Sequence, residues 1–320
     1  MPLQERQLIA RIRRNARGNR NRAVANAIGD DCAILRFSGG AEILLTTDFS
    51  IEGTHFRREW HAPDSAGHRC LARGLSDIAA MGGEPAAAFL SLAMPADLPQ
   101  KWADGFISGL LRLAKKHKVE LAGGDISVAP LICADIVVVG HAPRGSAISR
   151  SGAKPGHSIY VTGELGQAAA VLASLRADKK ISPRSAPGRR HFYPEPRVEV
   201  GQHLRRHKLA SAMIDISDGL STDLSHICQE SGVAALIAEH SIPRPSGWEA
   251  GSSSLHFALH GGDDYELLFT APSSAEIPRK IAGVTITPIG QITDGKRGEI
   301  FLTDSHGQRK KLTPGGWQVF

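Results

Sequence analysis

Short acidic clusters recur along this chain beside glycine, serine or threonine, and their chemistry is the first indication of function. They are Gly29-Asp30-Asp31, Thr46-Thr47-Asp48, Ser76-Asp77, Gly123-Gly124-Asp125 and Asp215-Ile216-Ser217-Asp218. Buried carboxylates lose their hydration, and neighbouring carboxylates repel one another unless cations neutralise them. Oxygen ligands of this kind suit Mg²⁺, which is usually held by a few carboxylates together with substrate phosphates. The pattern predicts a polyphosphate enzyme that uses several magnesium ions.

The first clusters each have a simpler interpretation beside the functional one. Thr46-Thr47-Asp48 follows an apolar, strand-like run, so it could lie at a ligand-binding sheet edge, or it could equally cap a helix or form a turn. In an extended segment Asp30 and Asp31 point to opposite faces, so only one is expected to reach a given site. Asp77 interrupts an apolar helix with small residues all round. A buried acid in that position requires a partner, which favours function.

The later clusters resemble common turns as well as binding loops. The glycines of Gly123-Gly124-Asp125 let backbone approach a phosphate, but the motif alone is weak. Asp215 and Ser217 share one face of an extended segment, whereas Ser217 or Asp218 could cap the following helix. The run Gly261-Gly262-Asp263-Asp264-Tyr265 precedes an apolar strand and favours a substrate loop over a surface turn. His55 could contact a phosphate or be a structural histidine.

The elements that must position these residues alternate between strand and helix, which predicts an α/β (α+β) fold in two domains, residues 1–145 and 146–320. We expect strands at 32–37, 42–47, 86–94, 119–122, 131–141, 158–162, 211–215, 233–238, 265–270, 284–292 and 299–303. We expect helices at 3–15, 64–81, 99–117, 165–176, 196–207, 219–231 and 274–282. Asp64 is the expected N-cap of its helix, residues 177–192 are expected to be a mobile excursion, and 241–254 a loop.

Composition and charge narrow the class of protein. The chain is 42% hydrophobic and 22% charged, with a formal net charge of +6. The excess lies mainly in residues 6–22 and 184–190, and no aromatic residues interleave with the N-terminal arginines, so we do not expect nucleic-acid binding. No apolar run approaches a membrane span or a signal core. Four widely spaced cysteines favour buried free thiols and a reducing cytoplasm over a metal centre.

Taken together, the motifs resemble those of the thiamine-monophosphate kinase family. The matching stretches occur in family order at residues 28–33 (IGDDCA), 46–56 (TTDFSIEGTHF), 75–82 (LSDIAAMG), 122–125 (AGGD), 149–156 (SRSGAKPG), 214–224 (IDISDGLSTDL) and 261–269 (GGDDYELLF). The resemblance spans nearly the whole chain. It implies the two-domain architecture of aminoimidazole-ribonucleotide synthetase, in which the N-terminal domains of a homodimer form a shared β-barrel.

The resemblance also implies an activity, in which ATP and thiamine monophosphate yield ADP and thiamine diphosphate with several Mg²⁺ ions. The implied metal ligands are Asp31, Thr46, Thr47, Asp48, Asp77, Asp125, Asp215 and Asp218. Of these, Asp48, Asp77, Asp125 and Asp218 are the implied catalytic residues. The implied nucleotide contacts are Gly124, Asp125, Arg150 and Ser217, and the implied substrate contacts are His55, Asp263 and Trp317.

The chain departs from the family pattern at two points in the substrate region. Asp263 stands where the family usually has glutamate, and the C-terminus carries Trp317 in place of a tyrosine-containing pattern. Two alternatives therefore remain: another phosphoryl-transfer enzyme of the same superfamily, or a non-catalytic nucleotide-binding protein. A selenophosphate synthetase should carry a reactive cysteine in a glycine-rich N-terminal loop. Cys32 directly follows the double aspartate without such a loop.

Overall fold

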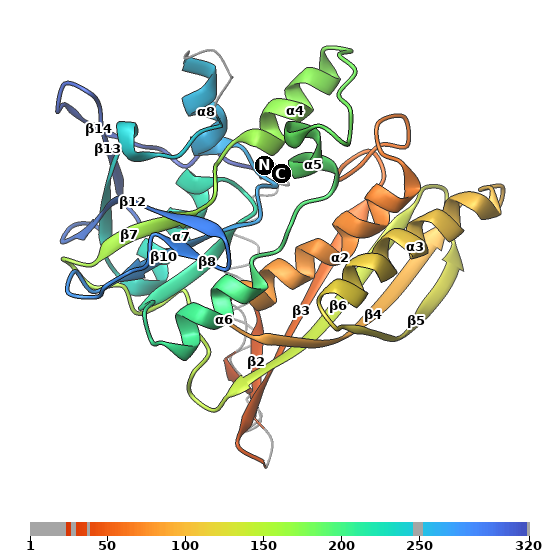
Figure 1. The fold of residues 1–320 in the computed structure, drawn as a ribbon, viewed down its shortest axis with the longest axis horizontal. Helices are drawn as coiled ribbons and strands as arrows, with labels where there is room; N and C mark the ends of the chain where they lie inside the picture. The colour runs from red at the N-terminus through yellow and green to blue at the C-terminus, as the bar shows by residue number, and fades with distance from the viewer. Residues whose placement is uncertain (1–23, 27–29, 37–38, 246–251, 319–320) are drawn as a thin grey trace, which may run out of the picture.

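The computed structural model describes residues 24–26, 30–36, 39–245 and 252–318. Within these residues the chain forms two units, each built on one sheet, that lie side by side (Figure 1). The predicted helix at 3–15 lies outside the described residues. Among the helices that the structure describes, none has both the length and the apolar character needed to cross a bilayer.

The first sheet contains six strands in the order β1-β2-β3-β6-β4-β5. They are β1 (Val24–Asn26), β2 (Ala33–Arg36), β3 (Ala41–Ile51), β4 (Glu84–Met94), β5 (Glu120–Val128) and β6 (Cys133–Pro143). Neighbouring strands are antiparallel except β4 and β5, which run parallel. Burial alternates along β6, with Ala134, Ile136 and Val138 facing the core, as expected for a sheet covered on one face.

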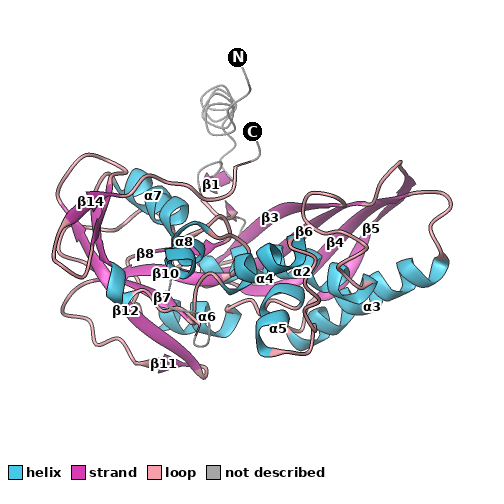
Figure 2. Ribbon diagram, turned by 90° about the horizontal axis from the view of Figure 1, so that it is seen from above, coloured by secondary structure: helices cyan, strands magenta, loops and turns pink. Residues whose placement is uncertain are grey.

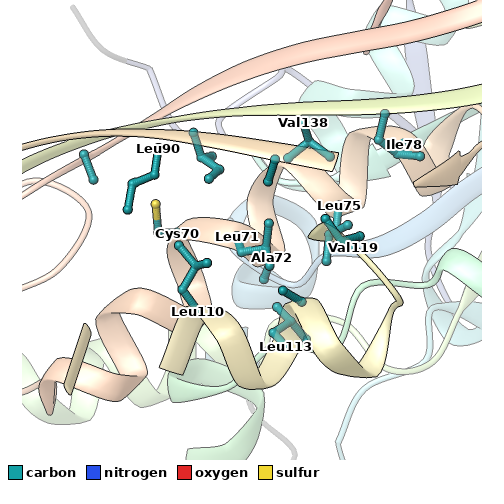
Figure 3. Close-up of a cluster of buried hydrophobic side chains, with 14 of the residues drawn as sticks. Cys70, Leu71, Ala72, Leu75, Ile78, Leu90, Leu110, Leu113, Val119 and Val138 are labelled. Atoms are coloured by element: carbon teal, nitrogen blue, oxygen red, sulfur yellow. The ribbon is translucent and has the colours of Figure 1, made fainter. Parts of the chain in front are cut away.

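Helices α2 (Pro63–Ala80) and α3 (Gln100–Lys116) cover one face of this sheet (Figure 2). Cys70 and Leu75 of α2 pack with Leu110 of α3 beneath the strands (Figure 3). The two helices approach so closely that a Cβ at Gly109 would lie 1.8 Å from the Asp64 carbonyl oxygen. This tight packing fixes α2 against the sheet.

The second sheet has the order β14-β13-β9-β12-β7-β10-β8, with β11 paired to β12. Its strands are β7 (Ser158–Thr162), β8 (Ala212–Ile216), β9 (Ala234–Ala238), β10 (Glu266–Ala271), β11 (Lys280–Ile281), β12 (Val284–Thr293), β13 (Ile300–Thr303) and β14 (Arg309–Lys311). The helices of this unit are α4 (Gln167–Arg176), α5 (Ala186–Phe192), α6 (Val198–Arg206), α7 (Leu220–Ser231) and α8 (Ser252–His260), with a 3₁₀ turn at Glu239–Ser241.

Helix α2 packs against both units and therefore links them. Ala79 and Ala80, at its end, join a buried cluster with Val200 and Met213 from the second unit. The Arg205 Nε donates a hydrogen bond of 2.6 Å to the Gly82 carbonyl oxygen just beyond the helix. The side of α2 that is turned away from the first sheet is therefore buried against elements of the second unit.

Several sequence-based expectations about local structure are wrong. Helix α2 begins at Pro63 with Ala62 as its N-cap, so Asp64 lies in the first turn and does not cap the helix. Strand β5 continues through Asp125 to Val128 because it pairs with β4 along that whole length. The predicted helix at 274–282 is absent: Pro278 would interrupt it, and residues 280–281 form β11 instead.

The basic segment at 177–192 contains a short helix that the sequence did not predict. The Ser185 hydroxyl accepts a hydrogen bond from the Gly188 N–H and caps α5. Phe192 is buried against Val171 and Leu175 of α4. A docked, capped helix replaces the expected mobile excursion, and α8 likewise begins inside the expected loop at 241–254.

Candidate active site

Three acids from separate elements form a compact cluster. Asp31 precedes β2, Asp77 lies in α2 and Asp215 lies in β8, and one carboxylate oxygen of each lies within 4.8 Å of the others. The Thr46 hydroxyl donates a hydrogen bond to Asp77 Oδ2. The Ser76 hydroxyl donates a hydrogen bond of 2.7 Å to Asp215 Oδ2. The fold therefore gathers four of the acidic motifs of the sequence at the junction of the two units.

The electrostatics of this cluster suit a bound cation. Burial, followed by the repulsion of Asp31, raises the pKa of Asp215 to about 8. Burial and the neighbouring Asp48 and Asp215 raise the pKa of Asp77 well above its usual range. Asp31 Oδ1 is buried without a hydrogen-bond partner. Hard oxygen ligands, mutual repulsion and an unsatisfied carboxylate oxygen together fit Mg²⁺.

Arg150 lies beside the cluster. Its Nε is 2.9 Å from Asp31 Oδ2, and its backbone N–H donates to Asp30 Oδ1 at 2.9 Å. Burial and then Asp31 raise the pKa of Asp30 to about 7. Both adjacent acids therefore contact Arg150, Asp30 through its backbone N–H and Asp31 through its guanidinium, and of the two only Asp31 belongs to the three-acid cluster.

A cavity of about 770 Å³ connects the acids to the predicted substrate residues. Its wall includes Asp48, Asp77, Asp215, Ser217, Asp218, His55, Asp263 and Trp317. The structure thereby brings eight of the sequence-predicted site residues to one cavity. Its size suits a small organic ligand.

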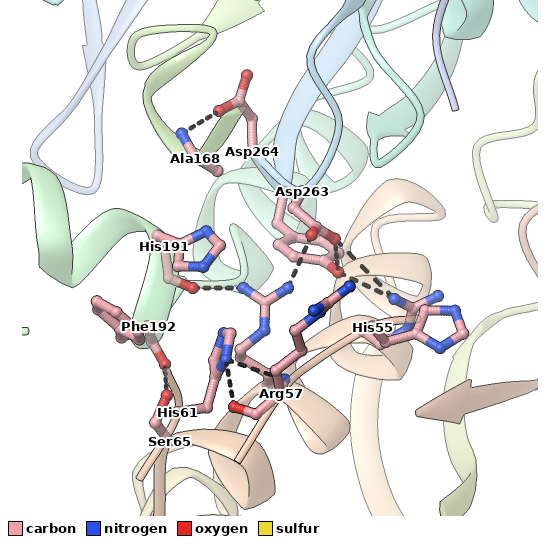
Figure 4. Close-up of polar contacts among 12 residues, drawn as sticks. His55, Arg57, His61, Ser65, Ala168, His191, Phe192, Asp263 and Asp264 are labelled. Carbon is pink, nitrogen blue, oxygen red and sulfur yellow. Dashed lines mark hydrogen bonds and ion pairs between the residues drawn. The ribbon is translucent and has the colours of Figure 1, made fainter. Parts of the chain in front are cut away.

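Asp263 is held by cations at the cavity wall (Figure 4). Its Oδ2 lies 2.7 Å from Arg69 Nη2, and its Oδ1 accepts a hydrogen bond of 2.7 Å from the Tyr265 hydroxyl. Burial alone would raise the pKa of Asp263, but Arg69 and Arg73 outweigh burial and hold this pKa below its usual range. Asp263 is therefore a charged acid near neutral pH in the predicted substrate region.

His55 and Trp317 border the same cavity in different ways. The Ile51 N–H donates to His55 Nδ1 at 3.0 Å, while burial and then Arg73 lower the pKa of His55 to about 4. His55 is therefore neutral near pH 7. The backbone N–H of Trp317 donates a hydrogen bond of 3.0 Å to the Asp218 carbonyl oxygen, and the residue is 47% exposed. Its ring is open to a ligand.

Gly124, Asp125 and Thr47 do not join this cavity within one chain. The Thr47 hydroxyl donates to Asp135 Oδ1 at 2.6 Å, and Asp125 borders a separate cavity of about 180 Å³ with Asp135. Gly124 has φ +153°, and a Cβ there would lie 1.9 Å from the Leu90 carbonyl oxygen. The glycine is thus required by the pairing of β5 with β4.

Asp218 has a second set of neighbours besides the large cavity. Its ligand atom lies within 4.8 Å of those of Asp223 and His226. Asp223 Oδ2 accepts the backbone N–H groups of Asp218 and Gly219 at 3.2 and 2.9 Å. Asp223 therefore holds the turn that carries Asp218.

Sequence reasoning missed the two arginines of α2 that face this region. Arg69, Arg73 and Asp77 are spaced four residues apart, so they lie along one side of the helix. That spacing was the available signal.

Comparison with known proteins agrees with the two-unit fold. Residues 29–142 match the AIR synthase related protein, N-terminal domain, and residues 154–303 match the corresponding C-terminal domain. Hydrogenase maturation protein HypE, at 16% identity and a TM-score of 0.72 in its complex with ATP, shares the fold. The fold and the two matched domains place the chain in the class of AIR synthase related proteins.

Relatives with higher sequence identity place the chain in one family within this class. The thiamine-monophosphate kinase of Salmonella typhimurium is 38% identical over 307 residues, 93% of each chain. That of Aquifex aeolicus is 34% identical over 92% of this chain and 94% of its own. The solved structure of AaThiL complexed with AMPPCP and TMP is 33% identical, with a TM-score of 0.87 over 100% of this chain and 99% of that chain. The chain belongs to the thiamine-monophosphate kinase family.

Proposed function

We propose that this protein transfers the γ-phosphoryl group of ATP to thiamine monophosphate, giving ADP and thiamine diphosphate. The observation that carries the proposal is the single cavity that joins the acids Asp48, Asp77 and Asp215 to His55, Asp263 and Trp317. Family membership and the AaThiL complex with AMPPCP and TMP support the same reaction.

The proposed reaction requires little proton transfer by side chains of the protein. A phosphate oxygen of thiamine monophosphate, already anionic near neutral pH, forms a bond to the γ-phosphorus of ATP, and the bond from that phosphorus to the bridging oxygen breaks, releasing ADP. Catalysis then depends on holding two anionic groups in line and neutralising them. This accounts for a site rich in acids and arginines, with a neutral His55 that needs no role as a base.

Several Mg²⁺ ions would be held by Asp31, Asp77 and Asp215. Thr46 contacts Asp77, and Asp48 and Asp218 line the same cavity, so these three could add oxygen ligands. When bound, the Mg²⁺ ions would neutralise and orient the phosphates of ATP. Arg150 adds positive charge beside Asp31. Asp263 and Trp317 would contact the cationic thiazolium and the rings of the substrate. We assign Ser217 to a contact with the bound nucleotide.

The assembly proposed is a homodimer formed through the uncovered face of the first sheet. Phe49 and Phe89 on that face are 55% and 40% exposed, and Gly124, Asp125 and Thr47 belong to the same sheet. We assign residues 1–145 to nucleotide binding and dimerisation and residues 146–320 to completing the site. The four free cysteines suit a reducing compartment, and we place the protein in the cytoplasm.

The experiment is a direct assay of purified protein with ATP, MgCl₂ and either thiamine monophosphate or thiamine. Thiamine diphosphate should form from thiamine monophosphate only when both ATP and Mg²⁺ are present, and EDTA should stop it. Thiamine should be a poor acceptor, since the site receives an anionic phosphate. Turnover of thiamine at an equal or higher rate would contradict the proposal.

A further inference from the structure

Arg73 is a cation in the wall of the large cavity. It lies in the middle of α2, one helical turn from Asp77. Its Nη2 is 3.5 Å from Asp48 Oδ1, and its Nη1 is 4.0 Å from Asp263 Oδ1 and 3.5 Å from the Tyr265 hydroxyl. Arg73 therefore stands between an acid of the predicted metal site and an acid of the predicted substrate region.

The hydrogen-bonding capacity of Arg73 is largely unused. Each contact from its terminal nitrogens is at the outer limit of a hydrogen bond or beyond it, and Nε has no partner. Arg69, one turn earlier, differs: it donates to the His191 carbonyl oxygen and to Asp263 at 2.7 Å, and its side chain is 4% exposed. Arg69 is committed to the protein, whereas the guanidinium of Arg73 is held in place with donors to spare.

The position of Arg73 matches a specific chemical need of the proposed reaction. The phosphate of the acceptor must lie close to the acids that would hold the nucleotide phosphates, while the organic part of the acceptor reaches Asp263. A guanidinium between these groups can bind phosphate with two parallel hydrogen bonds. Asp48 and Asp263 hold Arg73 from either side without saturating it.

We propose that Arg73 binds the phosphate group of thiamine monophosphate and thereby makes the site prefer the phosphorylated acceptor to thiamine. This inference rests on the proposed function and adds a residue that determines acceptor specificity. The simpler alternative is that Arg73 only neutralises the charges of Asp48 and Asp263. The two readings differ in what loss of Arg73 does to phosphorylated and unphosphorylated ligands.

The test compares Arg73→Met and Arg73→Lys with the parent protein and with the control Arg112→Met. Arg112 is an exposed surface arginine that pairs with Asp64 at 2.6 Å. Dissociation constants for thiamine monophosphate and for thiamine are measured by calorimetry in EDTA without ATP, and KM values in the full assay. Arg73→Met should weaken thiamine monophosphate about 10- to 100-fold, the usual effect of losing a charge-assisted bond, and leave thiamine within about twofold.

Arg73→Lys keeps the charge but loses the planar fork, so it should fall between the parent and Arg73→Met. Unchanged affinity and KM for thiamine monophosphate in Arg73→Met would overturn the inference. Equal weakening of both ligands, with a lower Tm, would also overturn it and leave Arg73 as a neutralising residue. Failure of the parent protein to convert thiamine monophosphate would refute the proposed function itself. An active parent with an unaffected Arg73→Met would refute the inference alone.

Discussion

Asp77 and Asp263 line one cavity with opposite electrostatics, and the difference lies in their neighbours. Asp77 faces Asp48 and Asp215, and burial together with these acids raises its pKa. Asp263 faces Arg69 and Arg73, which outweigh burial and lower its pKa. The surroundings of Asp77 therefore suit a bound cation, whereas Asp263 already pairs with Arg69. The residue type alone predicts neither state, because the contacting side chains come from distant parts of the chain.

Asp48→Asn tests the metal role at the residue scale. Loss of a charged ligand should lower kcat at least about 100-fold, because charge neutralisation in the transition state is lost. The metal-free protein should keep its Tm or gain slightly, since burial raises the pKa of Asp48 and its charge is costly there. Exposed Asp97→Asn is the control. An active Asp48→Asn protein, or one that does not fold, would count against the assignment.

The pH dependence of stability should reveal the carboxylate cluster. Asp215 titrates near pH 8 when folded and near its ordinary pKa of 3.8 when unfolded. The folded state therefore holds protons that the unfolded chain has released, so the contribution of Asp215 to the stability of the metal-free protein falls as pH rises from about 4 toward about 8. Because Mg²⁺ binds the deprotonated acids, the rise in Tm on replacing EDTA by MgCl₂ should be larger near pH 8 than near pH 5. An equal rise at both values would contradict this, and Asp215→Asn should reduce the difference.

At the scale of elements, α2 does most of the positioning, since Arg69, Arg73, Ser76 and Asp77 all project from it. Apolar periodicity was enough to predict this helix and most strands, and the recurring acidic motifs indicated the acids that the fold brings together. It could not predict that Asp125 would lie within β5, because that depends on pairing with β4. Nor could it reveal the docking of α5, whose basic composition concealed the buried Phe192. The local sequence pattern therefore predicts individual helices and strands, whereas the pairing of strands and helices in the fold determines which motifs lie close together.

The C-terminal tail around Trp317 is held by its backbone, so the role of the Trp317 ring can be tested separately. The Gly316 N–H donates to the Thr222 hydroxyl of α7 at 3.1 Å, and the Trp317 N–H to the Asp218 carbonyl oxygen, so the backbone is docked independently of the ring. Trp317→Ala should raise KM for thiamine monophosphate about tenfold and leave KM for ATP within about twofold, since stacking on a cation is lost. Trp317→Phe keeps an aromatic ring, so its KM for thiamine monophosphate should stay close to that of the parent protein. A lower Tm with both KM values unchanged would make Trp317 only an anchor.

At the scale of the whole molecule, the first sheet has two unlike faces. Cys70 and Leu110 lie beneath one, and Phe49 and Phe89 stand exposed on the other. An open apolar sheet face is unusual for an isolated subunit. The proposed homodimer would cover it.

Light scattering on the purified protein should give a mass about twice the 34.1 kDa chain. Phe89→Glu should shift it to a monomer, because a charge would be buried in an apolar interface. Leu111→Glu, on the outer side of α3 and 43% exposed, is the matched control and should stay dimeric. A monomeric parent protein would refute the dimer.

Transfer of the γ-phosphoryl group of ATP to the phosphate of thiamine monophosphate is the central claim, and isotopic labelling tests it most directly. ATP carrying ¹⁸O at its non-bridging γ-oxygens is incubated with the protein, Mg²⁺ and thiamine monophosphate, and the products are analysed by mass spectrometry. All of the labelled oxygens should appear together in the terminal phosphate of thiamine diphosphate, in step with the ADP formed. Label found in free phosphate without thiamine diphosphate, or in pyrophosphate beside AMP, would contradict the account.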